Sequence, residues 1–194
     1  MSEKELDEIV SEYNFEVNLA IGTGELPVEL DLEAFAEEMG VDYDPEKTNP
    51  GVDIRTQDKS LPMNTFHRSG KFILRTPDEE SLYEEHERTL DKFVELGVIS
   101  EDEADEIELN VSNLVCEADV GTHFKLSPLA VGLDFKHAEY EPEQFPAVIY
   151  KSDEYDCTFS VFASGKIIFA GGSSTEDSIR YLDKFIDEQL SIWM

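Results

Sequence analysis

The sequence predicts an α+β protein made of two repeats, each a curved antiparallel sheet with two helices on its convex face. Two observations indicate this fold class. Motifs recur in one order in the two halves of the chain, and in each half short alternating apolar segments lead into a long amphipathic helical pattern. The 194 residues, 40% of them apolar, suffice for two fused units that each bury a core.

The internal repeat rests on six motif pairs that keep the same order. The longest pair is RTLDKF at residues 88–93 and RYLDKF at residues 180–185. The others are residues 43–46 with 140–143, residues 49–52 with 145–148, residues 69–71 with 164–166, Arg55 with Lys151, and Asn18 with Asn113. Because such an ordered set is hard to obtain by chance, we predict a first repeat over residues 1–98, an acidic connector over 99–108 and a second repeat over 109–194.

Each repeat is predicted to run from a strand through a short helix and a loop into four meandering strands and a long helix. The first strands cover residues 15–21 and 113–119, the short helices 31–38 and 127–133, and the long helices 77–96 and 175–193. The long helices are amphipathic, with apolar stripes that include Leu82, Leu90 and Phe93 in one and Ile179, Leu182 and Phe185 in the other. In the connector, SEDEADEIE is expected to add a further helical turn.

The clearest sheet segment covers residues 138–171, where short alternating strands are joined by turns. One predicted face carries Phe145, Thr158, Ser160, Phe162, Ile168 and Ala170, and the other carries Cys157, Phe159, Val161, Ile167 and Phe169. The second face is apolar and is predicted to lie under a helix. The first face mixes two large aromatic side chains with small residues, and on pattern alone such phenylalanines are most often ordinary core residues.

The net charge of −30 is extreme and normally argues against nucleic acid, since nonspecific affinity comes largely from basic side chains that neutralise phosphates. The alternative is a chain that works in molar salt, where the Debye length falls to about 3 Å and an acidic surface maintains solubility. Acidic residues are spread over the whole chain and lysine is scarce. This pattern is typical of a salt-accumulating archaeon.

Other functional classes lack support in the sequence. No apolar run reaches 18 residues, and no basic region followed by an apolar block opens the chain, so we predict a cytoplasmic protein without a membrane span. Cys116 and Cys157 form no CxxC motif and are predicted as small core residues. The four histidines are dispersed, and no G-x-S-x-G or P-loop occurs, so we predict no enzyme, no cofactor and no metal site.

Residues 140–151, YEPEQFPAVIYK, and residues 159–172, FSVFASGKIIFAGG, closely resemble the TATA-box-binding protein family. The resemblance extends over about residues 14–192 and implies a pseudo-twofold saddle with helices on its convex side. It also implies a general transcription initiation factor that binds double-stranded A·T-rich promoter DNA in the minor groove, bends it, and recruits transcription factor B and, indirectly, RNA polymerase. The second hypothesis is a divergent family member with weakened DNA binding that acts as a protein-interaction module.

The resemblance places six second-repeat residues on the DNA side: Asn113, Val115, Phe145, Phe162, Ile168 and Ala170. Phe145 and Phe162 would be the wedge pair that opens a base step from the minor groove. The Asn113 amide can donate to A N3 or T O2, and apolar residues fit a groove floor that lacks the guanine amine. The carboxylate of Glu117 would face the same groove and oppose binding.

The corresponding first-repeat residues are Asn18, Ala20, Asn49, His67, Ile73 and Arg75. If the Ser-Gly-Lys match sets the register, Asn49 and His67 occupy the wedge positions and Phe66 points into the core. A register shifted by one residue would return Phe66 to the groove face and turn His67 inward; the Ser-Gly-Lys match favours the first arrangement. Arg75 is placed to read a narrow minor groove electrostatically.

Further contacts follow from the resemblance alone. Phosphate contacts are expected at Arg55, Lys71, Lys151 and Lys166, and transcription factor B is expected to meet Glu141, Glu143 and Gln144. The chain is expected to bind DNA as a monomer, with a homodimer in the free state as an open alternative, and no membrane partner is expected.

Overall fold

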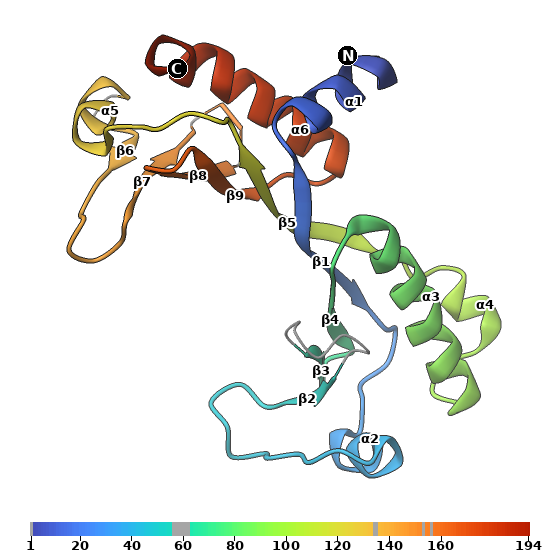
Figure 1. The fold of residues 1–194 in the computed structure, drawn as a ribbon. Coiled ribbons are helices and arrows are strands. Elements are labelled where there is room, and N and C mark those ends of the chain that lie inside the picture. Colours follow the sequence, from blue (N-terminus) through green and yellow to red (C-terminus); the bar gives the residue numbers. More distant parts are fainter. Residues whose placement is uncertain (1, 56–62, 134–135, 153, 156) are drawn as a thin grey trace. The chain divides into compact units, whose positions relative to one another are not determined.

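The computed structural model describes residues 2–55, 63–133, 136–152, 154–155 and 157–194. The chain forms two compact units (Figure 1). We call Leu19–Ser112 the first-repeat unit, and the other unit, Met1–Asn18 with Asn113–Met194, the second-repeat unit. Each unit combines antiparallel strands with helices, so the predicted α+β class is confirmed.

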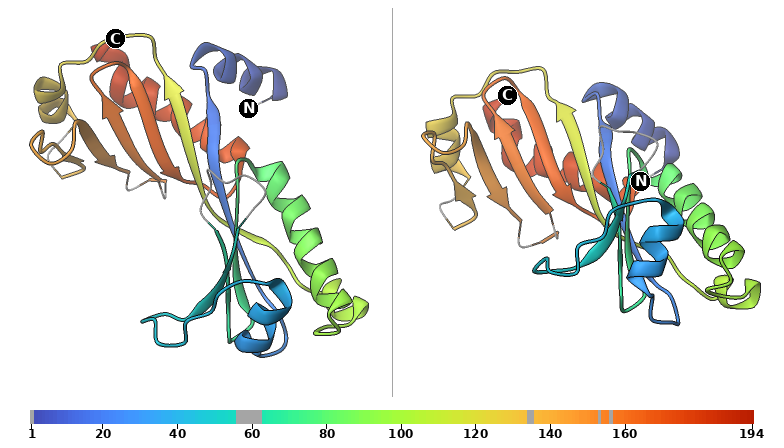
Figure 2. Two further views of the ribbon diagram at one scale, coloured as in Figure 1. Left: turned by 60° about the horizontal axis from the view of Figure 1, so that its bottom comes forward. Right: turned by 90° about the horizontal axis from the view of Figure 1, so that it is seen from below.

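The first-repeat unit orders its strands β2-β3-β4-β1 (Figures 1 and 2). Its elements are β1 (Glu16–Glu25, from Leu19 onward in this unit), α2 (Leu32–Met39), β2 (Gly51–Ile54), β3 (Asn64–His67), β4 (Lys71–Thr76), α3 (Glu79–Glu95) and α4 (Glu101–Ala104). Helix α3 begins where the Asp78 carboxylate accepts a hydrogen bond from the Ser81 amide at 2.7 Å. Helix α2 ends at Gly40, whose φ of 66° suits a residue without a Cβ.

The second-repeat unit orders its strands β5-β9-β8-β7-β6. Its elements are α1 (Glu3–Glu12), β5 (Asn110–Asp119, from Asn113 onward in this unit), α5 (Leu126–Gly132), β6 (Ala138–Glu139), β7 (Ala147–Lys151), β8 (Cys157–Phe162), β9 (Lys166–Gly171) and α6 (Thr175–Phe185). A π-helical turn, Ile186–Leu190, and a 3-10 turn, Ser191–Trp193, follow α6.

Each unit buries one face of its strands under helices. In the second-repeat unit the Phe159 ring, fully buried, stacks on Phe185 at 4.1 Å and on Phe169 at 5.2 Å between ring centroids. In the first-repeat unit Phe35, Phe66 and Phe93 form the corresponding cluster, with centroids 5.2 to 5.7 Å apart. Burial of these side chains supplies most of the driving force that holds helix to sheet.

Most predicted elements are confirmed, with three differences. In the first-repeat unit three strands, β2 to β4, follow α2 within the described residues, where four were predicted; in the second-repeat unit four strands, β6 to β9, follow α5. The last helix is α-helical only to Phe185, and its final turns are π and 3-10. Helix α1 was missed, although Ser2 and Glu5 form a capping box that marks its start. The expected helical turn in the connector is α4, and both cysteines are buried and free, as predicted.

Among the described helices, none combines the length and the apolar character that crossing a bilayer requires.

Candidate nucleic-acid interface

The strands of the second-repeat unit leave one face without helices. Side chains on this face are partly exposed, while those between them along β5, β8 and β9 are buried, which confirms the predicted alternation. We call this set the second-repeat open face; it comprises Asn113, Val115, Glu117, Thr158, Ser160, Phe162, Ile168 and Ala170. Pairing places Val115 opposite Ala170 and Ser160 opposite Ile168, so the predicted groove residues lie together.

Phe145 and Phe162 lie against each other at the edge of this face. Their ring centroids are 5.8 Å apart and the ring planes meet at 68°, an edge-to-face arrangement. Phe145 is 40% exposed, although Phe159, Phe169 and Phe185 are fully buried in the same unit. A turn in which the Phe145 amide donates to Glu141 O at 2.9 Å holds Phe145 just before β7. The pair is therefore accessible to a ligand and is not core.

A carboxylate lies on the same face, as predicted for Glu117. It forms an ion pair with Lys166 Nζ at 2.5 Å and accepts a hydrogen bond from Asn18 Nδ2 at 3.3 Å. Glu117 thus engages an expected phosphate contact and an expected base reader together. Lys151 is similarly paired with Glu139 at 3.2 Å. Both pairs are substantially exposed, so each contributes little to stability and weakens further in salt.

The first-repeat unit also has a face without helices, and its side chains are mainly polar. We call this set the first-repeat open face; it comprises Ile21, Thr23, Asp53, Thr65, His67, Ile73 and Arg75. Phe66 is buried against Phe72, while His67 is partly exposed, so the Ser-Gly-Lys register is confirmed for this hairpin. Asn49 is exposed in the loop before β2.

The placement expected for Ala20 is wrong. Strand β1 pairs with β4 so that Ala20 is opposite Thr76 and Ile21 is opposite Arg75, one residue out of step with the pairing of β5 and β9. Ala20 therefore lies on the helix side and is fully buried. Gly24 lies on that side too, and a Cβ there would come within 2.2 Å of the Phe72 ring. Ile21 takes the open-face position instead.

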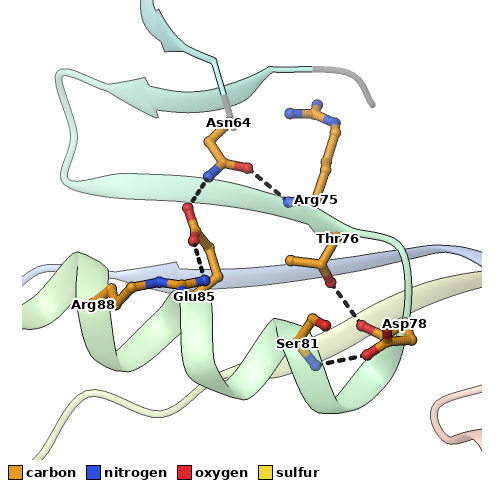
Figure 3. A network of polar contacts seen from close by, with 7 residues as sticks. All are labelled: Asn64, Arg75, Thr76, Asp78, Ser81, Glu85 and Arg88. Atoms are coloured by element: carbon orange, nitrogen blue, oxygen red, sulfur yellow. Dashed lines mark hydrogen bonds and ion pairs between the residues drawn. The ribbon is translucent and has the colours of Figure 1, made fainter. Parts of the chain in front are cut away.

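Arg75 is held in place by hydrogen bonds on the first-repeat open face (Figure 3). Its guanidinium donates to Met63 O and to Thr65 Oγ1, and Thr65 in turn donates to Asp53 Oδ1 at 2.9 Å. Its amide donates to Asn64 Oδ1 at 2.8 Å. Asp53 and Thr65 were not among the predicted site residues; the alternation of residues along β2 and β3 was the signal that could have identified them.

Asn64 connects this face to the helix behind it. The side chain is buried, with 2% exposed, and its amide donates to Glu85 Oε1 at 2.7 Å, while Glu85 pairs with Arg88 at 2.8 Å (Figure 3). The network links β3, β4 and α3, and it gives both polar side-chain atoms of the buried Asn64 a partner.

The remaining expected contacts are exposed. Arg55, Lys71 and Lys151 lie at the surface, and Lys166 is partly exposed. Glu141, Glu143 and Gln144 are exposed in the turn before β7, where the Gln144 side chain donates to Glu141.

Neither the buried Cys116 thiol nor a metal-ligand cluster among the described residues supports catalytic chemistry. Burial raises the pKa of the Cys116 thiol to about 12, which makes it a poor nucleophile. Within the described residues no three His, Cys, Asp or Glu side chains are grouped to hold a metal ion.

Comparisons with known proteins agree with this geometry. A family model described as transcription factor TFIID (or TATA-binding protein, TBP) matches residues 108–188, and a family of transcription factors is consistent with the prediction that the chain is not an enzyme. The chain shares the fold of Methanococcus jannaschii TBP, with a TM-score of 0.71 at 24% identity over 91% of this chain and 98% of that one.

Relatives at higher identity extend over both repeats. The TATA-box-binding protein of Haloarcula marismortui is 36% identical over 88% of this chain and 89% of its own length. The TATA-box-binding protein 2 of Haloferax volcanii is 37% identical over the same shares. These archaeal sources fit the acidic composition, and on this similarity the chain belongs to the TATA-box-binding protein family.

Proposed function

We propose that the chain is a general transcription initiation factor that binds A·T-rich promoter DNA in the minor groove and bends it. The observation that carries this proposal is the exposed Phe145–Phe162 pair on a sheet face without helices. The names of the relatives, TATA-box-binding proteins, point to the same function.

The second-repeat open face has the chemistry that a minor groove rich in A·T pairs requires. Val115, Ile168 and Ala170 give an apolar surface that suits a groove floor without the guanine amine, and Asn113 supplies an amide donor. Phe145 and Phe162 enter a base step and partly unstack it, at a cost of a few kcal/mol that the contacts of the bent duplex offset.

The first-repeat open face binds DNA mainly through polar and charged side chains instead of apolar ones. It has Asn49 and His67 at the wedge positions and also presents the Arg75 guanidinium, so we propose that it contacts the groove electrostatically and kinks DNA less. Arg55, Lys71, Lys151 and Lys166 contact phosphates, and the last two exchange a carboxylate partner for a phosphate.

We also propose that the chain binds DNA as a monomer in the cytoplasm and works with transcription factor B and, through it, RNA polymerase. Glu141, Glu143 and Gln144 support this partner, since they form an exposed, acidic turn next to the wedge pair. A basic surface on the partner would complement it.

A gel-shift experiment on an A·T-rich duplex in molar KCl tests the proposal. Replacing Phe145 and Phe162 by alanine is expected to weaken binding by about 100-fold, the equivalent of a few kcal/mol. Tyr83→Ala is the matched control, because Tyr83 is 49% exposed on α3, on the helix side. Failure of the unmodified chain to bind at any salt concentration would reject the proposal and favour the interaction-module hypothesis.

The affinity for DNA should depend on salt in the direction opposite to that of most DNA-binding proteins. If the acidic surface takes up cations when DNA binds, affinity is expected to rise with KCl concentration, opposite to the usual release of counterions. A steep decline from low salt upward in the same titration would contradict cation uptake.

A further inference from the structure

The first-repeat unit contains an open pocket on its helix side. The pocket has a volume of about 290 Å³ and lies among α2, α3, β2 and β3. Phe35, Phe66 and Phe93 contribute an aromatic floor, and Ile54 and Met39 extend it. This volume is near the lower end of the range for small-ligand sites, and the space suits one large side chain.

Basic side chains line the rim of this pocket. Among the described lining residues, Arg55, Arg88 and Lys92 are accompanied by one carboxylate, Glu85, so these residues carry a formal charge of +2 in a chain of −30. Arg88 pairs with Glu85, as Figure 3 shows, and Lys92 pairs with the exposed Glu95 at 3.2 Å. A local positive charge on so acidic a protein favours an anionic ligand.

The second repeat shows which ligand fits. The RYLDKF motif of α6 matches the RTLDKF motif of α3, so Lys184 corresponds to Lys92 and Tyr181 to Thr89. At this place in the second-repeat unit the ring of Tyr155, 9% exposed, stacks on Tyr181 with centroids 5.0 Å apart. Lys184 lies 5.2 Å from the Tyr155 ring centroid and pairs with the Glu154 carboxylate.

The first repeat does not encode this occupant. Tyr155 and Glu154 belong to the segment between β7 and β8, and the corresponding segment between β2 and β3 includes residues 56–62, TQDKSLP, which contain no aromatic residue. Residues 56–62 lie outside the described part of the chain. Thr89 also replaces the tyrosine on which the ring stacks in the second repeat.

We infer that the first-repeat pocket binds a partner protein's peptide segment in which a carboxylate residue directly precedes an aromatic residue, as Glu154 precedes Tyr155. The aromatic ring covers the phenylalanine floor, and the carboxylate pairs with Lys92. Shape, charge and the internal precedent of the second repeat support the same ligand. The pocket lies on the helix side, and Arg55 on its rim is also a proposed phosphate contact. The variants that test the pocket therefore change Lys92, which has no part in the proposed DNA contacts, so the pocket and DNA binding can fail independently.

Nuclear magnetic resonance with the isotope-labelled full chain in molar KCl tests this inference. The probe is the capped peptide SDEYD, which has the sequence of residues 152–156. Saturable shifts are expected for pocket residues such as Ile54, Thr89 and Lys92, and the peptide SDEAD should lose most of the effect. Absence of saturable shifts in the unmodified chain at millimolar peptide would overturn the inference.

Reversing one charge at the rim of the pocket distinguishes specific peptide binding from nonspecific electrostatic attraction of the peptide. Lys92→Glu is expected to weaken peptide binding about fivefold or more, the scale of one lost ion pair and cation–π contact. The control is Lys4→Glu on α1, where Lys4 is 87% exposed and pairs only loosely with Glu8, at 3.6 Å. Equal weakening by both variants would show that attraction is nonspecific and would overturn the inference.

A further variant tests the comparison with the second repeat. Tyr155→Ala removes the natural occupant of the second-repeat site, so SDEYD should raise the thermal midpoint of this variant more than that of the unmodified chain. Equal shifts in both proteins would count against equivalence of the two sites.

Discussion

The two repeats have similar cores but different open faces. In the cores the RTLDKF and RYLDKF helices bury equivalent phenylalanines, Phe93 and Phe185, each at most 1% exposed. On the open faces, the second repeat exposes an aromatic pair on an apolar surface, whereas the first holds Arg75, Thr65 and Asp53 in a hydrogen-bonded array. Core positions are constrained by close packing, while a solvent-facing side chain is constrained mainly by its ligand.

The largest expected difference between the repeats concerns one equivalent position in their cores. Asn64 and Phe159 occupy matching places on β3 and β8, and both are buried. Phe159→Ala should lower the free energy of unfolding by about 3–5 kcal/mol, because it leaves a cavity. Asn64→Ala should cost about 1–3 kcal/mol, because Glu85 and the Arg75 amide lose a partner. Denaturant unfolding at fixed KCl measures both; a larger loss for Asn64→Ala would contradict the comparison.

Wedge residues can be grafted onto the first repeat. The double variant Asn49→Phe, His67→Phe gives the first-repeat open face the pair that the second repeat has, and it is expected to add a kink of about 20–90° to bound DNA. End-to-end fluorescence transfer on a duplex labelled at both ends measures the bend. Two equal kinks already present with the unmodified chain would refute the proposed asymmetry.

Removing the Glu117 carboxylate from the second-repeat open face is expected to change the affinity for DNA by a smaller amount. Glu117→Gln removes the ion pair that engages Lys166 and should strengthen DNA binding about fivefold at low salt, less in molar KCl where the pair is screened. Glu84→Gln makes the same charge change on an exposed residue of α3 and should leave affinity nearly unchanged. Equal gains from both substitutions would indicate only a net-charge effect.

The smallest expected difference between the repeats is a pH dependence of stability that comes from His86 on α3. Burial lowers the pKa of His86, while Glu87 raises it to a lesser extent, and Ser178 is the uncharged counterpart on α6. Because the folded pKa lies below the unfolded one, the unfolded chain binds more protons as pH falls below about 6.5, and stability declines. His86→Ser should reduce this decline between pH 7 and 5. An unchanged decline in thermal melts would show that other groups cause it.

Much of this arrangement could be predicted from sequence. The strand alternation correctly separated Phe162 and Ile168 from Phe159 and Phe169, because side chains of a strand alternate between two faces. The same reasoning failed for Ala20, since alternation does not determine the pairing register, and a slip of one residue moves every side chain to the other face. The role of Asn64 was equally hidden, because its partners Glu85 and Arg75 come from other elements.

Local periodicity and motifs close in the chain were enough to predict the internal repeat, the order of most elements and the division between core and open face. Three features became visible only in the folded chain: Glu117 pairs with Lys166, Ile21 takes the open-face position expected for Ala20, and the first-repeat unit has a pocket beside Lys92. Each of these depends on distances between side chains far apart in sequence, which are fixed when strands pair and helices pack.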